Sequence, residues 1–205
     1  MNDEFSRSDI GLARRRAMSL AKESRYGDAA DVLAEVAAPA SHNLGVADPD
    51  VIGLRWQLAN VLFDGQNHRR AAREFQQIAD DLLRQAEPDH EQISHCKLQE
   101  ATCHVHAGDP ELALHIMREL LADDMSRFPE DDARLLELRR QIGELEVSVG
   151  AADKARATLT DLRDDLNRLY GPDHGATIRV SELLASLPPT EAVLSRPRGA
   201  AEDER

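Results

Sequence analysis

The amino-acid sequence predicts an all-α protein, a right-handed α-solenoid of helix pairs. Two columns of small residues recur every 42 residues and are offset from each other by 12. The first column is Ala29, Ala71, Ala113 and Ala155, and the second is Ala17, Ala59, Ala101, Gly143 and Ala185. A fixed period of about 20 to 50 residues is typical of solenoids, in which stacked units share one continuous core.

The positions between and after these columns predict how each unit folds. A turn position separates two helical segments, and it holds Ser24, Gln66, Gly108 and Gly150. Small residues on both segments would let the two helix axes approach to the short end of the usual ~8–10 Å. Large apolar residues follow the first column after four positions, as Leu33, Phe75, Met117 and Leu159, and after seven, as Val36, Ile78, Leu120 and Leu162. This i, i+4, i+7 spacing indicates an amphipathic helix.

We therefore expect about four helix pairs and one further helix. The pairs are residues 8–23 with 27–38, 49–64 with 67–86, 89–107 with 110–127, and 131–149 with 152–170. The unpaired helix, 173–187, is expected to cap the last pair. The repeat domain is then 1–187, with units at about 8–38, 49–86, 89–127 and 131–170 and the cap at 173–187.

Helix-terminating residues support these boundaries. Asp48-Pro49 and Asp109-Pro110 each place a capping acceptor before a proline at the first helical position. The second helix of the first unit is expected to be short, with a loop at 39–45 that would be a hinge or a distortion of the array. After Pro188-Pro189, the segment 188–205 has almost no apolar content and is expected to be a disordered tail.

Together these features resemble the tetratricopeptide repeat (TPR): a small residue, a glycine-like turn, alanine twelve positions after the small residue, and a large apolar residue four further on. The period exceeds the usual length of about 34 residues and resembles the kinesin-light-chain-type subclass, as do the loops 87–90 and 170–177. The resemblance covers about residues 8–187. It departs from the pattern where His104 and Glu146 stand in the column of Leu20 and Leu62. Residues 31–187 also resemble the repeat region that follows the catalytic domain in many actinobacterial serine/threonine protein kinases.

Charge and composition narrow the partners and the compartment. The formal net charge is −13, and such a surface repels phosphate backbones, so we expect no nucleic-acid partner. The acidic residues 1–5 do not begin a signal peptide, and no apolar run approaches the ~20 residues that span a bilayer. Two cysteines indicate no disulfide framework, so a reducing cytoplasm is expected.

The TPR resemblance implies that the first helix of each pair lines a concave groove. The candidate peptide-binding residues on that face are Arg14, Trp56, Asn60, Phe63, Leu98, Thr102, Val105 and Arg140. Trp56, Asn60 and Phe63 are spaced i, i+4, i+7 and share one helix face. An amide between two aromatic rings can bind a peptide backbone, and the two arginines can bind carboxylates. The alternative is that both aromatic rings pack in the core.

No residue pattern in the sequence indicates a metal site or a catalytic site. His95, Cys96, Cys103, His104 and His106 suggest zinc, but on one helix the two cysteines lie about 10.5 Å apart along the axis. Zn–S bonds of about 2.3 Å cannot span that distance, so buried thiols are favoured over a metal site. The sequence also lacks a phosphate-binding loop, a nucleophile elbow and the kinase catalytic loops, so we expect neither catalysis nor a cofactor.

The leading hypothesis is a non-catalytic protein–protein interaction module that binds a peptide or protein segment in its groove, in a signalling or regulatory context. This step is an analogy from the fold. The alternative is a stand-alone or separated C-terminal regulatory or sensor region of a bacterial serine/threonine protein kinase. A third hypothesis is an enzyme with an unrecognised site, which one deep pocket with converging titratable groups would favour.

Overall fold

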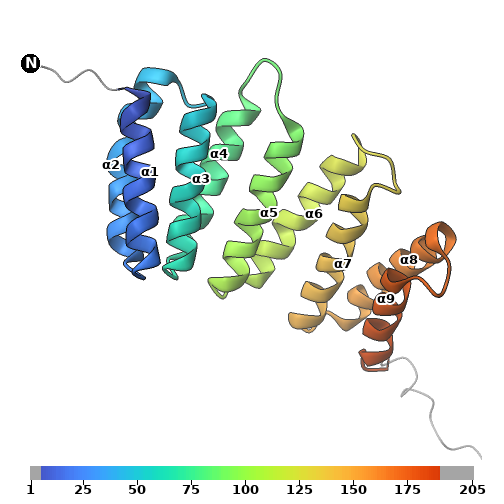
Figure 1. Cartoon of the computed structure of the whole chain (residues 1–205). Coiled ribbons are helices and arrows are strands. Elements are labelled where there is room, and N and C mark those ends of the chain that lie inside the picture. Colours follow the sequence, from blue (N-terminus) through green and yellow to red (C-terminus); the bar gives the residue numbers. More distant parts are fainter. Residues whose placement is uncertain (1–5, 190–205) are drawn as a thin grey trace, which may run out of the picture. The chain divides into compact units, whose positions relative to one another are not determined.

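The computed structural model describes residues 6–189 and divides into two compact units, the first ending at Arg127 and the second beginning at Phe128. Throughout the described range the regular structure is helical, which confirms the predicted all-α repeat fold (Figure 1). The first unit contains α1 (Arg7–Lys22), α2 (Tyr26–Leu44), α3 (Pro49–Asp64), α4 (His68–Leu83), α5 (His90–His106) and α6 (Pro110–Met125). The second contains α7 (Ala133–Ser148), α8 (Ala152–Tyr170) and α9 (Gly175–Ser186).

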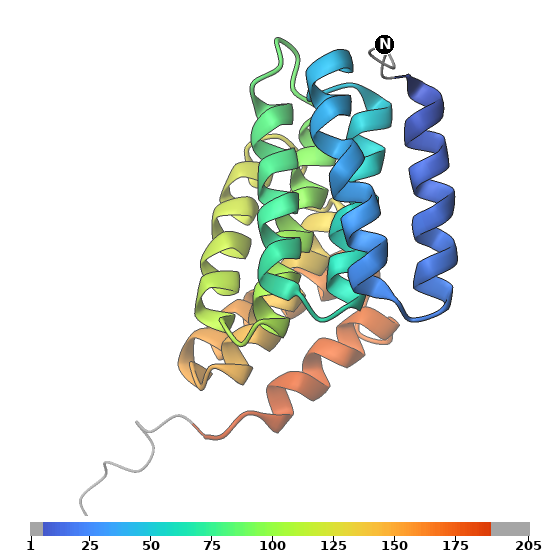
Figure 2. The same cartoon turned by 90° about the vertical axis from the view of Figure 1, so that its left-hand side faces the viewer.

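Each helix packs mainly on its sequence neighbours inside its own unit. In the first unit α1 packs on α2, α2 on α3, and so on to α6, and α1 also contacts α3. Two layers result, with α1, α3 and α5 in one and α2, α4 and α6 in the other (Figures 1 and 2). In the second unit α8 packs on both α7 and α9.

The two small-residue columns lie where neighbouring helices approach most closely. The four alanines of the first column and the first three of the second are all 0% exposed. Gly143 is buried against Leu159 of α8. Ala185 is the exception, because it is exposed on α9, after which no further helix follows within the described residues. The columns therefore mark the contact between the two helices of a pair.

The turn inside each pair is built in the same way four times. The backbone N–H of the residue after the turn position donates to the carbonyl five residues back, in bonds of 2.8–2.9 Å from Arg25, Asn67, Asp109 and Ala151. The turn residue itself has a positive φ, which is 59° at Ser24, 61° at Gln66, 82° at Gly108 and 76° at Gly150. This is the Schellman helix ending, which favours glycine.

Gln66→Gly should therefore stabilise the protein, by up to about 1 kcal/mol. A left-handed conformation costs a residue with a Cβ about 1–2 kcal/mol, which outweighs the greater chain entropy that glycine has when unfolded. Gly108→Ala should instead destabilise the protein. Urea unfolding of both variants tests the pair, and a destabilised Gln66→Gly would show that the Gln66 side chain makes an important contact.

The expected loop at 39–45 is wrong. Helix α2 continues through Pro39 to Leu44 and ends at Gly45, where φ is 94°. Proline inside a helix removes one backbone hydrogen bond, but Ala40 beside it is 0% exposed and packs into the core. The second helix of the fourth pair ends in the same way as α2. Helix α8 also has 19 residues and stops at Gly171, where φ is 87°.

Two other local predictions had different outcomes. Asp48 caps α3 by accepting from the Asp50 N–H at 2.9 Å, as expected. Asp109 precedes α6 but makes no capping bond with its side chain, because its carboxylate accepts from Arg69 at 3.2 Å instead. The tail expected at 188–205 falls outside the described residues apart from Pro188 and Pro189, and the Pro188 carbonyl accepts a bond from Arg156.

The structure also reveals a charged column that the sequence reasoning missed. A cation on the first helix of a pair meets an aspartate on the second, with the same 26-residue separation each time. The pairs are Arg55–Asp81 at 2.6 Å, Lys97–Asp123 at 3.4 Å and Arg139–Asp165 at 2.7 Å. In the first pair the two positions hold Ala13 and Pro39. These ion pairs therefore join the two helices of the second, third and fourth pairs.

Candidate peptide-binding face

A depression of about 750 Å³ opens between α3 and α5 in the first unit. We call it the α3–α5 pocket. It is lined by Ala47, Pro49, Ile52, Gly53, Trp56, Leu82, Gln85, Ala86, Glu87, Asp89 and Gln92. These residues come from the N-terminal parts of α3 and α5 and from the end of α4 with its following loop.

The α3–α5 pocket combines an apolar base with a polar rim. Ile52 and Leu82 are 8% and 5% exposed and belong to one core cluster with the half-buried Trp56 beside it. Gln85 and Gln92 contribute side-chain amides. Such a surface can accept an apolar side chain while the amides bond to a peptide backbone.

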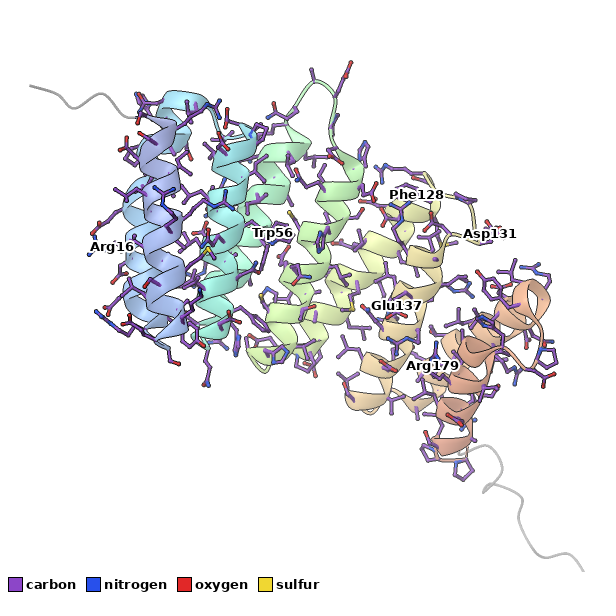
Figure 3. All side chains as sticks on the ribbon, in the orientation of Figure 1. Arg16, Trp56, Phe128, Asp131, Glu137 and Arg179 are labelled. Carbon is purple, nitrogen blue, oxygen red and sulfur yellow. The ribbon has the colours of Figure 1, made fainter. Side chains whose placement is uncertain are left out.

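Gly53, which has no side chain, is one of the residues that line the pocket. Gly53 belongs to a 42-residue column whose members are Gly11, Gly53, His95, Glu137 and Arg179. In the second unit the equivalent positions line a cavity of only about 140 Å³. There Glu137 stands in place of Gly53 and pairs at 2.5 Å with Arg140, which stands in place of Trp56. Figure 3 labels Glu137 and Trp56, which mark the two places.

Electrostatics also distinguish the cavity in the second unit. The hydrogen bond from Arg140 holds the pKa of Glu137 below its usual value. Arg140 bonds Glu144 as well, so its guanidinium already has two carboxylate partners on its own helix. Since a guanidinium that is already paired gains less from a further carboxylate, Arg140 is a poorer carboxylate ligand than the sequence suggested.

The Trp56 ring serves both the core and the α3–α5 pocket. Its indole lies edge-on to the buried Phe75, with ring centroids 4.9 Å apart. On another side it contacts His95 of α5 at 4.7 Å. Of the two alternatives that the sequence left open for this residue, packing in the core therefore holds in part, and a role in peptide binding stays a prediction.

Phe63 lies in a separate aromatic cluster at the other end of α3. Its ring centroid is 4.9 Å from those of His68 and His106. Seven helical residues separate Trp56 from Phe63, which is about 10.5 Å along the axis. Asn60 lies between them on the same helix and is exposed. Its side-chain amide makes no hydrogen bond to any other residue of the described range. Its amide is thus available to a ligand on this face.

The remaining candidates have varied surroundings. Arg14 donates from Nε to the Gln57 side chain at 2.9 Å and lies beside Gly53. On α5, Leu98 is half-buried, the Thr102 hydroxyl bonds the Leu98 carbonyl at 2.9 Å, and Val105 is 39% exposed. Arg140 belongs to the second unit, so its position relative to the first-unit candidates is not defined.

Sequence reasoning missed two residues of this face. Gly53 was overlooked because a missing side chain carries no positive motif, and His95 was considered only as a zinc ligand. The column that contains both residues was nevertheless visible in the sequence. Comparing it across the repeats shows glycine in the first and second repeats, and only in the second does this glycine lie near the chain's one tryptophan.

The two cysteines are buried on α5, and burial raises the pKa of Cys96 to about 12 and that of Cys103 to about 11. Both thiols are thus protonated at neutral pH, which makes them poor nucleophiles. Among residues 6–189 no group of three or more histidine, cysteine or acidic side chains is arranged to hold a metal ion. No helix in that range is both long and apolar enough to cross a membrane.

Comparisons with known proteins identify the fold. No protein-family model and no curated protein matches the sequence. Solved structures do match: two from Podosopora anserina are of a kinesin light chain with nearly identical TPR-like repeats. They align with TM-scores of 0.67 and 0.66 at 16% identity, over 87% of this chain and 83% and 82% of theirs. BtubC (BKLC) from P. vanneervenii aligns with a TM-score of 0.56 at 13% identity, over 86% of this chain and 63% of that one. The chain therefore has the fold of TPR-like repeats.

Proposed function

We propose that the protein is a non-catalytic scaffold that binds a peptide segment of another protein on the face formed by α1, α3 and α5. The α3–α5 pocket would take one apolar side chain of that segment. The observation that carries this proposal is the open pocket at Gly53, beside the chain's one tryptophan. A role in signalling or regulation, including attachment to a serine/threonine kinase, rests on the sequence resemblance alone.

The chemistry of the face supports a peptide rather than a small reactive substrate. Aromatic side chains in partly desolvated pockets contribute disproportionately to protein–protein binding. Peptides also need hydrogen bonds for their backbone, which Gln85, Gln92 and Asn60 can supply along the same face. The pocket and this face thus offer both kinds of contact that an extended or helical segment needs.

Gly53→Glu is the sharpest test, because it places in the first unit the residue found at the equivalent position 137. A Cβ at Gly53 would meet only the Arg14 guanidinium, at 3.6 Å, so the helix can accept the new side chain. Peptides selected from a random library on the wild-type protein should bind Gly53→Glu at least tenfold more weakly. The fluorescence of Trp56, the chain's one tryptophan, reports binding directly because a peptide in the pocket would cover the indole.

Gly11→Glu is the matched control, since it makes the same substitution in the same column on α1, outside the pocket. It should bind the selected peptides like wild type. Melting temperatures of both variants separate lost binding from lost folding. Trp56→Ala is less informative, because removing the ring also removes its contact with Phe75 in the core. Equal binding by Gly53→Glu and wild type would place the interaction elsewhere.

A further inference from the structure

The third helix pair carries polar side chains at core positions where other pairs are apolar. Ser94 and Asp124 occupy the columns that hold Ile52 and Leu82 in the second pair. The structure brings these two polar residues together, with the Ser94 hydroxyl donating to the Asp124 carboxylate at 2.7 Å. The two polar side chains are therefore hydrogen-bond partners of each other, as expected for buried polar groups.

Two further replacements on α5 are not satisfied in this way. Glu100 stands in the column of Leu58 and Ile142, and His104 in that of Leu20 and Leu62. Glu100 is 8% exposed, and its side chain makes no hydrogen bond or ion pair with any residue between 6 and 189. The Nδ1 atom of His104 is buried and also lacks a hydrogen-bond partner in that range. Burying such groups without partners costs stability, so their presence suggests a partner from outside the described chain.

Both groups line the same hollow, which we call the α4–α6 groove. It encloses about 410 Å³, and α5 provides its base through Glu100 and His104, one helical turn apart. One wall is Arg69, Ala72, Arg73 and Gln76 of α4, and the other is Leu112, His115, Ile116 and Glu119 of α6, with Asp109 at the turn between α5 and α6. No residue of this groove lines the α3–α5 pocket.

The charges around Glu100 leave a negative surplus. Arg69 is neutralised by Asp109 at 3.2 Å, and Lys97 by Asp123 at 3.4 Å. Arg73 remains as a cation on the α4 wall. Lys97 also attracts the Glu100 carboxylate. Within residues 6–189 the acidic groups that outnumber these cations are Glu100, the Asp80 carboxylate that acts on it from α4, and Glu119, which lies 3.4 Å from the His115 imidazole. A cation that donates hydrogen bonds would match this arrangement.

The protonation states of the two groups support the same conclusion. Burial, with a smaller contribution from Asp80, raises the pKa of Glu100 to about 7. Burial lowers the pKa of His104, which keeps its imidazole neutral near pH 7 and leaves one ring nitrogen as an acceptor. Both side chains can then accept hydrogen bonds from one donor group, once Glu100 has lost its proton.

We propose that the α4–α6 groove binds an alkylammonium group, with the ammonium bonded to Glu100 and His104 and the alkyl chain against Ala72, Leu112 and Ile116. A free aliphatic amine and the side chain of a partner's lysine share this chemistry. The proposal is independent of peptide binding at the α3–α5 pocket, because the two sites have no residue in common.

Binding should strengthen as the pH rises. An ammonium binds the ionised carboxylate, and a group of pKa about 7 is about one-tenth ionised at pH 6 and nine-tenths ionised at pH 8. Affinity should therefore rise about tenfold between these two pH values. The other titratable side chains that line the site are Arg69 and Arg73 on α4, His104 on α5, Asp109 at the turn, and His115 and Glu119 on α6. The thiols of Cys96 and Cys103 on α5 stay protonated. A variant that cannot ionise at position 100 isolates the contribution of Glu100.

The experiment is an NMR titration of the full chain with n-butylammonium chloride at pH 6 and pH 8, at constant ionic strength. Saturable shifts should appear in α5 around Glu100 and His104, with about tenfold tighter binding at pH 8. Glu100→Gln should weaken binding at least tenfold and remove most of the pH dependence. Glu111→Gln, which removes an exposed carboxylate elsewhere on α6, should bind like wild type. Nα-acetyl-lysine amide is titrated in parallel, and its binding would extend the site to a protein lysine, whereas binding of butylammonium alone would assign it to a free amine.

Three results would overturn the assignment: no saturable shift at either pH, equal binding by Glu100→Gln, or tighter binding of butyrate than of butylammonium. Glu100→Leu provides a second check, because it restores the residue of the second pair. It should raise the melting temperature while abolishing amine binding. A lowered melting temperature for Glu100→Leu would instead mean that the carboxyl stabilises the fold, and would also refute the proposal.

Discussion

Gly143→Ala should lower the free energy of unfolding by about 1–3 kcal/mol, although it adds a single methyl group. A Cβ at this position would lie 2.4 Å from Cδ2 and 2.7 Å from Cγ of Leu159. Leu159 is itself 0% exposed, so it has no room to withdraw. The helices α7 and α8 would have to separate, and urea unfolding followed by circular dichroism measures the cost.

Gly27→Ala is the matched control for this prediction. Gly27 lies inside helix α2, and a Cβ added there would meet nothing within 4 Å. Gly27 is in the first turn of α2, where the advantage of alanine is smaller than the ~1 kcal/mol of a helix interior, so Gly27→Ala should stabilise the protein slightly. If both variants stabilised the protein, the close approach of Leu159 would not be the reason for the small residue at position 143.

The parts of the fold that the sequence predicted are those with a local or strictly repeated cause. Each turn needs a residue at positive φ, and the small column needs space, so both requirements recur with the period of the repeat. The continuation of α2 through Pro39 was not predictable in this way. Proline is a local signal for a helix end, and the burial of Ala40 that opposes it depends on tertiary contacts.

The candidate site was predictable only in part, for a similar reason. Trp56 is a conspicuous residue at a position that the repeat pattern assigns to the groove. The α3–α5 pocket beside it is lined in part by Gly53, and the small residue at that position is noticed only when the same column is compared across repeats. The roles of Glu100 and His104 needed coordinates, because the sequence shows where polar residues replace apolar ones but not whether they find partners.

The repeated ion pair between the two helices of a pair gives the second large expected effect. Removing the carboxylate should cost most where the pair is most buried, because a buried charge left alone cannot be solvated. Side-chain exposures are 9% and 18% for Arg55–Asp81, 18% and 30% for Arg139–Asp165, and 29% and 53% for Lys97–Asp123. The three pairs thus form a graded series within one protein.

We expect Asp81→Asn to destabilise by about 3 kcal/mol, at the lower end of the range for a broken buried pair because Arg55 keeps contacts with Gln77 and Glu74. Asp123→Asn should cost less than about 1 kcal/mol, as for an exposed pair, and Asp165→Asn should fall between the two. Salt should reduce the cost of Asp123→Asn and hardly change that of Asp81→Asn, since screening acts mainly on exposed charges. Urea unfolding of the three variants at low and high salt measures both trends. Equal costs at all three positions would mean that the aspartates act through a shared helical feature, such as their hydrogen bonds near the helix end, rather than through the buried charge.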